Sequence, residues 1–261
     1  MKLQSHSRLA ASLGFAAFLL AGTAVAADLR IVSSGGGMAA LKAVAPEYER
    51  QTGTHLVIEP GPSMGETPNA IPQRLARGEN IDALVMVGAA LDKLVQQGKV
   101  AEPSMVAISR IGGVVKQGAP TPDISTVEGL RTAMLSARSI AVSDSASGVY
   151  IQSQMLKKLG IEGQVRDKVK MIPADPVGGV VAKGDADLGF QQISELKATT
   201  GVTLLGLIAD AVQEATPYKA GVVESSHQKD LARNFIRFLA SPEAAVAIRA
   251  SGLDPVSPAG K

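Results

Sequence analysis

The sequence contains no cysteine and no tryptophan, and only 3% of its 261 residues are aromatic. Without cysteine the chain cannot form disulfides, thiolate metal sites, a cysteine nucleophile or a lipid-modified N-terminal cysteine. The scarcity of aromatic side chains argues against sites that stack sugars or nucleic-acid bases. The rest of the composition is that of a folded protein, because 46% of the residues are hydrophobic and only 19% are charged.

An excess of charge of either sign is also missing. Lysine and arginine number 26, and aspartate and glutamate number 24, but Lys2 and Arg8 belong to a leader segment described next. Without these two the chain carries 24 basic and 24 acidic side chains. A neutral chain has no electrostatic reason to bind nucleic acid or an anionic membrane, and neither is expected as a partner.

The first residues are typical of a secretion signal. Two basic residues precede an uncharged apolar run over 9–22, and the Ala-Val-Ala at 24–26 supplies the small residues that a signal peptidase recognises. The run is shorter than the roughly 20 residues of a membrane-spanning helix, and no later run approaches that length. We therefore expect a signal peptide over 1–26, a mature chain that begins at residue 27 or 28, a periplasmic location and no membrane insertion of the mature chain.

Beyond the leader, short apolar strands alternate with helical patterns. Residues 81–87 are nearly all apolar, as is typical of a strand buried on both faces. The order strand, helix, strand, helix predicts an α/β fold with a parallel sheet and crossover helices. A long strand over 106–116 is expected to pass between two lobes. A helix is expected to follow the glycine run 35–37 and to end at Gly53. Further helices are expected over residues 67–77, 89–98, 147–159, 177–183, 227–240 and 242–251.

Five loops follow predicted strands, at the position where ligands bind in an open parallel sheet. Each loop is small and polar, and none contains lysine or arginine. Glycine lets a backbone N–H approach a ligand, helix N-termini add partial positive charge, and serine and glutamine add neutral donors. These features predict a pocket for an anion held by dipoles, although any one loop could be an ordinary capped turn. The loops are residues 33–37, 62–67, 143–148, 175–179 and 191–194.

Motifs for nucleotide, metal or acyl chemistry are not found. The glycine run 35–37 lacks the spacing of a dinucleotide site, and there is no Walker lysine loop and no Gly-x-Ser-x-Gly elbow. His55 and His227 are far apart in the sequence, so neither a zinc site nor a Ser-His-Asp triad is expected. Ser194 and Lys197 fit a Ser-x-x-Lys pattern that is short enough to arise by chance. We expect no cofactor and no metal.

Several stretches resemble the periplasmic molybdate-binding proteins, a branch of the two-lobed type II solute-binding proteins. The similarity runs along nearly the whole mature chain, and its most telling stretches are residues 142–150, 159–160 and 218–245. The resemblance implies two α/β lobes with a ligand cleft between them. One lobe would contain residues 28–108 and 213–261, and the other would contain residues 109–212.

The resemblance also implies positions at which a small anion would bind. Ser63, Ser147 and Val177 fall near the family's contact positions. The glycine run 35–37 and Gln192 depart from the molybdate pattern, which has a serine-bearing loop and a tyrosine there. These departures favour a carboxylate ligand. The expected ligand-binding residues are Gly36, Gly37, Met38, Ser63, Met64, Gly65, Ser147, Gly148, Val177, Gly178, Gln191 and Gln192.

Two functions remain open. The family includes an isomerase that interconverts cis- and trans-aconitate by moving an allylic proton, which requires a base and stabilisation of a carbanion. Glu66, in a loop that is uncharged in the molybdate pattern, is then the expected catalytic base, or else a solvated loop residue. Alternatively, the protein delivers an oxyanion or small carboxylate to an ABC importer, and its partner is the membrane permease.

Overall fold

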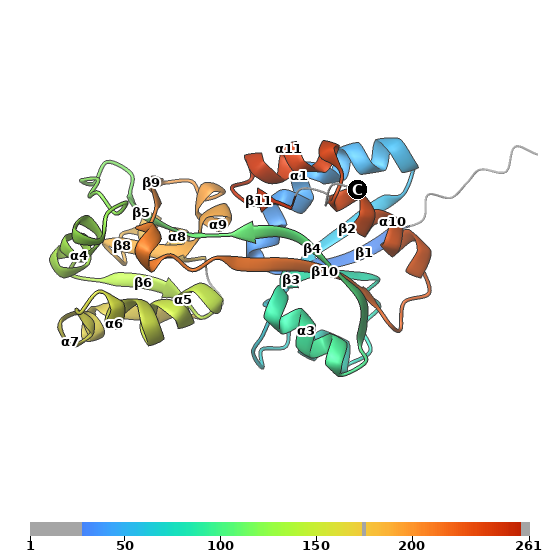
Figure 1. Ribbon diagram of the computed structural model, residues 1–261, viewed down its shortest axis with the longest axis horizontal. Helices are drawn as coiled ribbons and strands as arrows, with labels where there is room; N and C mark the ends of the chain where they lie inside the picture. Colours follow the sequence, from blue (N-terminus) through green and yellow to red (C-terminus); the bar gives the residue numbers. More distant parts are fainter. Residues whose placement is uncertain (1–27, 174–175, 257–261) are drawn as a thin grey trace, which may run out of the picture.

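The structure, a computed structural model, describes residues 28–173 and 176–256. The predicted signal peptide lies outside the described residues. The described chain forms two lobes that lie side by side, each built around its own β-sheet (Figure 1). This arrangement confirms the two α/β lobes that the sequence predicts. No helix of the described ranges is long and apolar enough to cross a membrane.

The first lobe contains a six-stranded sheet in the order β11-β4-β10-β3-β1-β2. Helices α1, α10 and α11 pack on one hydrophobic cluster of this lobe, and residues of α2 and α3 belong to a second one. The strands are β1 (Asp28–Ser33), β2 (His55–Pro60), β3 (Ala83–Val87), β4 (Val100–Ser109), β10 (Thr216–Val223) and β11 (Asp254–Pro255). The helices are α1 (Gly35–Thr52), α2 (Ile71–Ala76), α3 (Gly88–Gln96), α10 (Lys229–Leu239) and α11 (Pro242–Ala250).

The second lobe contains a five-stranded sheet in the order β7-β6-β8-β5-β9. A π-helical turn over Ile151–Met155 joins α5 and α6, so the helix expected over 147–159 is one continuous segment with a wider middle turn. The strands are β5 (Ile111–Lys116), β6 (Ile140–Ser143), β7 (Val169–Ile172), β8 (Leu188–Gln192) and β9 (Val202–Leu207). The helices are α4 (Val127–Ser136), α5 (Ala146–Tyr150), α6 (Leu156–Lys158), α7 (Glu162–Val165), α8 (Val177–Lys183) and α9 (Ile193–Lys197), with 3-10 turns at Arg166–Lys168 and Asp210–Val212.

The strands that connect the lobes correct two sequence predictions. The single strand expected over 106–116 is two strands, because β4 pairs in the first sheet and β5 in the second, with Arg110 between them. The sheets are also mixed and not purely parallel. β10 runs antiparallel to β3 and β4, and β5 runs antiparallel to β8 and β9, because these strands enter from the other lobe.

The chain changes sheets at Arg110 and again between Leu207 and Thr216. These positions lie beside the boundaries that the resemblance implies, and the assignment of residues to domains stays a prediction. Figure 1 shows β4 and β10 running through the middle of the molecule toward the second lobe. The two connecting segments therefore hold the lobes next to each other along one side.

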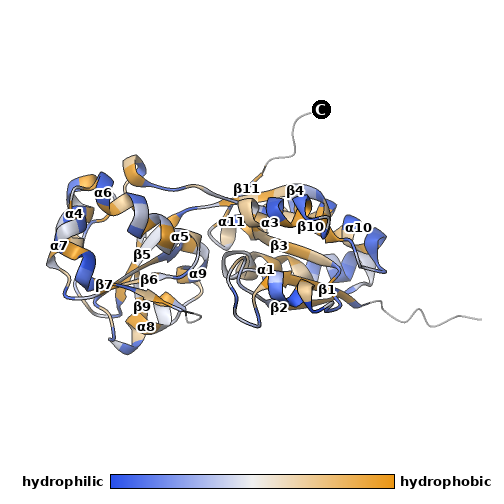
Figure 2. Ribbon diagram, turned by 90° about the horizontal axis from the view of Figure 1, so that it is seen from below, coloured by the Kyte–Doolittle hydropathy of each residue, from blue (hydrophilic) through white to orange (hydrophobic). Residues whose placement is uncertain are grey.

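The central strands of both lobes are buried. Every residue of β3 is buried, as its all-apolar sequence predicts, and all of β6 and β8 are buried as well. Figure 2 shows the strands largely apolar and the hydrophilic stretches on the outer helices.

Helix α1 begins directly after β1 and ends before Gly53. The left-handed backbone of Gly53 (φ 70°) lets its N–H donate to Glu49 O at 2.8 Å.

Candidate functional site

A cavity of about 370 Å³ lies between the two lobes, at the ends of strands that carry the predicted loops. Its walls come from residues 34–35, 60–65, 67, 69, 87 and 218 of the first lobe and from residues 143–146, 176, 191, 192 and 195 of the second. None of these described residues is lysine or arginine, whereas Asp144 and Glu195 are acidic. An anion in this cavity would therefore meet backbone and neutral side-chain dipoles.

The glycine run 35–37 forms the first turn of α1 and makes room for two ionisable side chains. A Cβ added to Gly35 would collide with the carboxylate of Glu195, and one added to Gly36 would collide with the hydroxyl of Tyr218. The sequence predicts that these glycines let backbone N–H groups approach a ligand. The structure gives them a further role, because they allow Glu195 and Tyr218 to lie against the start of the helix.

Glu195 belongs to α9 of the second lobe, and the protein encloses its carboxyl from both lobes. Gln191 Nε2 donates to Glu195 Oε2 at 2.6 Å, and Gln191 Oε1 accepts from the backbone N–H of Val177 at 3.1 Å. Burial, and secondly the negative charge of Asp144, raises the pKa of Glu195 to about 7. Part of the side chain still faces the cavity. This carboxyl can therefore take up or release a proton near neutral pH.

Tyr218 lies on β10 of the first lobe and is 2% exposed, with its hydroxyl against Gly36. Burial raises the pKa of this phenol well above its usual range, and the negative charge of Glu195 adds to the effect. The Ser34 hydroxyl lies close enough to lower this pKa, yet it meets no partner in hydrogen-bond geometry within the described ranges. Tyr218 is thus a neutral phenol beside a carboxyl that titrates.

Neutral hydrogen-bonding groups complete the wall. Ser63 Oγ accepts a backbone N–H from the end of β3 at 3.1 Å, and Ser143 Oγ lies 2.8 Å from Ser145 Oγ. Gln192 Nε2 donates to Thr216 Oγ1 at 3.1 Å, while the buried Gln192 Oε1 has no partner among the described residues. Within residues 28–173 and 176–256, no group of three histidine, aspartate or glutamate side chains is placed to hold a metal ion.

The structure brings together part of the ligand-binding set that the sequence predicts. The predicted residues that line the cavity are Ser63, Met64, Gly65, Gln191 and Gln192. The others lie in the first turns of α1, α5 and α8 and are not among the lining residues; they are Gly36, Gly37, Met38, Ser147, Gly148, Val177 and Gly178. Ligand contact by all of these residues stays a prediction.

Glu66, the base expected from the sequence, is exposed and is not among the lining residues, although its neighbours Gly65 and Thr67 are. Its catalytic role stays a prediction that its position does not favour. Sequence reasoning did not single out Glu195 or Tyr218. A signal existed for Glu195, which comes directly after the predicted loop 191–194, but Tyr218 lies inside a strand and gave none.

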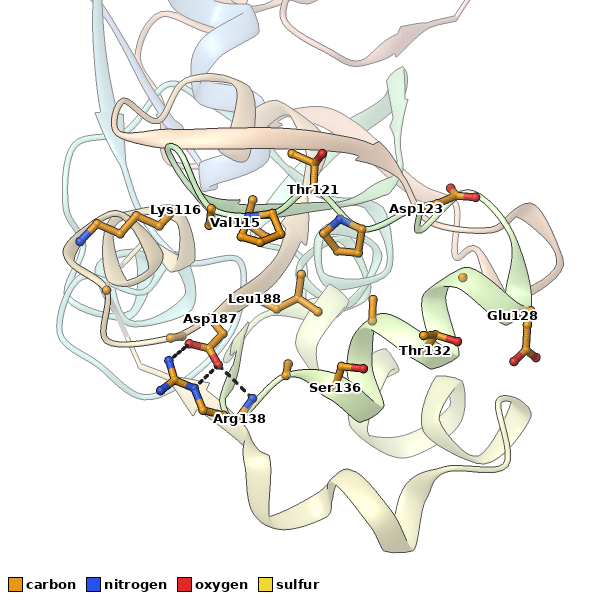
Figure 3. Close-up of a pocket in the computed structure, with 18 residues that line it drawn as sticks. Val115, Lys116, Thr121, Asp123, Glu128, Thr132, Ser136, Arg138, Asp187 and Leu188 are labelled. Atoms are coloured by element: carbon orange, nitrogen blue, oxygen red, sulfur yellow. Dashed lines mark hydrogen bonds and ion pairs between the residues drawn. The ribbon is translucent and has the colours of Figure 1, made fainter.

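A second hollow, of about 950 Å³, lies in the second lobe between α4, the segment before it and the start of β8 (Figure 3). It is larger than the cavity between the lobes and contains none of the predicted site residues. Its charged groups have partners in the chain: Arg138 Nη2 donates to Asp187 Oδ1 at 2.8 Å, and Lys116 Nζ reaches Lys183 O at 3.5 Å. We place the functional site between the lobes, where a carboxyl with a raised pKa lines a cavity together with Gln191 and Gln192.

Comparison with known proteins finds matches along nearly the whole chain. The aconitate isomerase of a Pseudomonas species is 47% identical over 252 residues, which cover 94% of this chain and 96% of that protein. The periplasmic molybdate-binding protein of Azotobacter vinelandii has the same fold, with a TM-score of 0.70, 22% identity and coverage of 88% of this chain and 100% of that one. The sulfate-binding protein SubI of Mycobacterium tuberculosis matches with a TM-score of 0.69, 18% identity and coverage of 89% and 88%.

The family model for the bacterial extracellular solute-binding protein matches residues 29–254, which is nearly all of the chain that the structure describes. Both lobes and both connecting segments fall within the match. The chain therefore belongs to the bacterial extracellular solute-binding proteins.

Proposed function

We propose that this protein is a periplasmic aconitate isomerase, which interconverts cis- and trans-aconitate by moving one allylic proton. The relative that is 47% identical along nearly the whole of both chains carries that name. The family description, an extracellular solute-binding protein, agrees with export to the periplasm. A small tricarboxylate also matches a cavity of about 370 Å³, which lies within the size range of small-ligand sites.

The observation that carries this proposal is the Glu195 carboxyl in the wall of the cavity, with its pKa raised to about 7. A general base works best when its pKa lies near the operating pH, because it is then both deprotonated and basic enough to remove a proton. Gln191 holds the carboxyl by a hydrogen bond to Oε2. The other oxygen, Oε1, is left as the one that can receive a proton.

In the proposed step one proton moves from one carbon of the substrate to another by way of Glu195, and no electrons are gained or lost. The Glu195 carboxylate removes a proton from the methylene carbon, and the C–H electron pair spreads over three carbons and into the attached carboxylate. The same carboxyl then returns the proton to the carbon at the other end, so the double bond shifts by one position. Oxidation state is unchanged, and Glu195 ends as it began.

The acidic lining accommodates an anionic ligand best when one of its two carboxyls carries a proton. A carboxylate about 4 Å from another negative charge is repelled by on the order of several kcal/mol at an effective dielectric near 20. Both Asp144 and Glu195 line this cavity, which contains no lysine or arginine among its described residues. Glu195 avoids much of the repulsion when it is protonated, as it is for part of the time near neutral pH.

Substitution of the two candidate bases tests the proposal. Glu195→Gln keeps the shape of the side chain and removes the base, so the kcat for conversion of trans-aconitate should fall at least about a hundredfold. Affinity for trans-aconitate, measured by calorimetry, should change little. Glu66→Gln is the matched control and should behave like the wild type, because Glu66 is exposed and is not among the lining residues. Full activity of the Glu195 variant would rule out Glu195 as the base.

A role in transport is the second candidate, and the family match favours it. In that role the lobes would enclose a small carboxylate or oxyanion for delivery to an ABC importer. Tight binding of trans-aconitate by the wild type without any turnover would support this role and contradict the isomerase.

A further inference from the structure

We infer that Tyr218 is a second catalytic residue, whose hydroxyl donates a hydrogen bond to the substrate carboxylate that takes up negative charge during the reaction. The inference rests on the proposed isomerase function and deepens it. It assigns to Tyr218 a task that Glu195 cannot perform, because a group that receives the proton cannot also stabilise the electron pair left behind.

The position of Tyr218 is fixed by both its ring and its hydroxyl. The ring is buried in the apolar cluster of the first lobe that also contains Val32 and Val87. The residue lines the cavity, and its hydroxyl lies so close to Gly36 that any side chain at that position would displace it. A residue with a side chain at position 36 would therefore remove the hydroxyl from the site. Glycine at position 36 thus leaves room for the Tyr218 hydroxyl in the site.

The local electrostatics keep this hydroxyl a donor. Burial and the charge of Glu195 hold the pKa of Tyr218 well above its usual range, whereas burial and the charge of Asp144 bring the pKa of Glu195 to about 7. Two adjacent groups whose pKa values are pushed apart divide the work of a base and a neutral donor. The first turn of the 18-residue helix α1 adds partial positive charge at the same place.

The hydrogen bond strengthens as the reaction proceeds. Removal of the allylic proton converts the adjacent carboxylate toward an enediolate, whose oxygens carry more negative charge than in the substrate. A fixed donor that meets this charge stabilises the transition state more than the bound substrate. The phenol proton stays on the Tyr218 oxygen throughout, so the proton balance of the Glu195 step does not change.

Tyr218→Phe tests the inference, and Tyr48→Phe is its matched control. Tyr48 is equally buried, and its hydroxyl has no partner among the described residues, but it lies in the core of the first lobe. The Tyr218 variant should lose roughly 10²–10³-fold in kcat while the affinity for trans-aconitate stays within about threefold. The rise of kcat/KM with pH should keep its midpoint near 7, because Glu195 remains the base. The Tyr48 variant should match the wild type.

Each outcome separates this inference from the proposed function. If the wild type isomerises aconitate and Tyr218→Phe is equally active, the inference fails and the function stands. A loss of kcat with an equal loss of affinity, or with a displaced pH midpoint, would make Tyr218 a binding or positioning residue and also overturn the inference. If the wild type does not isomerise aconitate, both fail. Should Tyr218→Phe not fold, Gly36→Ala, which displaces the hydroxyl, must show a comparable loss of kcat; otherwise the inference fails.

Discussion

Glu195 illustrates how a single residue acquires its chemistry from distant parts of the chain. Its carboxyl is held by Gln191 of its own lobe, packed against Gly35 of the other lobe and placed within the field of Asp144. The same glutamate on an open surface would be fully ionised near neutral pH. The enclosure therefore gives an ordinary side chain the raised pKa that the proposed general base requires.

The raised pKa of Glu195 also predicts a pH-dependent stability. A carboxyl with a folded-state pKa near 7 binds its proton more tightly than in the unfolded chain, so its contribution is full below about pH 4.5 and is lost as the pH rises through about 7. Glu195→Gln lacks this loss. Relative to the wild type, the variant should gain on the order of 1–3 kcal/mol of unfolding free energy between about pH 4.5 and about pH 8. Urea denaturation at both pH values measures the difference, and parallel pH profiles would contradict it.

At this scale the sequence predicts the loops better than it predicts the reacting groups. Small polar segments after strands predict the loops at the cavity, and Ser63, Gly65 and Gln192 line it, while their contact with a ligand stays a prediction. The burial of Glu195 could not be predicted, because it depends on a glycine about 160 positions earlier in the chain. The sequence predicts Glu66 as a base because it is the one charged residue of its loop, but nothing in the local sequence tells whether a loop carboxylate faces the cavity or solvent.

Junctions between strands and helices position the site at the scale of elements. β1 leads into α1, β6 into α5 and β8 into α9, and each junction contributes lining residues to the cavity. Except for α9, which is not among the expected helices, these elements were predictable because apolar runs of strand length alternate with helical spacing. The antiparallel direction of β5 and β10 was not predictable, since it depends on which lobe each strand enters and not on its own residues.

The end of β6 and the first turn of α5 pack closely against each other at Gly148. A Cβ on Gly148 would overlap the backbone oxygen of Ser143, and backbone atoms cannot move aside as a flexible side chain can. Gly148→Ala should therefore destabilise the protein by about 3 kcal/mol. Gly179→Ala in α8 is the control, because nothing lies within 4 Å of its added Cβ. Thermal denaturation should show a lowered Tm for the first variant and an unchanged or slightly raised Tm for the second. Equal Tm values would contradict the tight packing described here.

The whole molecule closes its cavity by contacts between the lobes. Ser194 Oγ donates to Gly36 O at 2.9 Å, and Lys197 Nζ donates to Ala250 O at 2.9 Å. Glu195 lies between these two residues of α9, so its carboxyl is enclosed only while the lobes are in contact. A solute-binding scaffold thus provides, on closure, the enclosed carboxyl that proton transfer requires.

The measurement that tests this account most directly is proton NMR of trans-aconitate incubated with the purified protein. The account predicts that cis-aconitate appears at a rate proportional to the protein concentration, and that Glu195→Gln reduces this rate at least about a hundredfold. A trans-aconitate spectrum that stays unchanged in the presence of the wild-type protein would contradict the account.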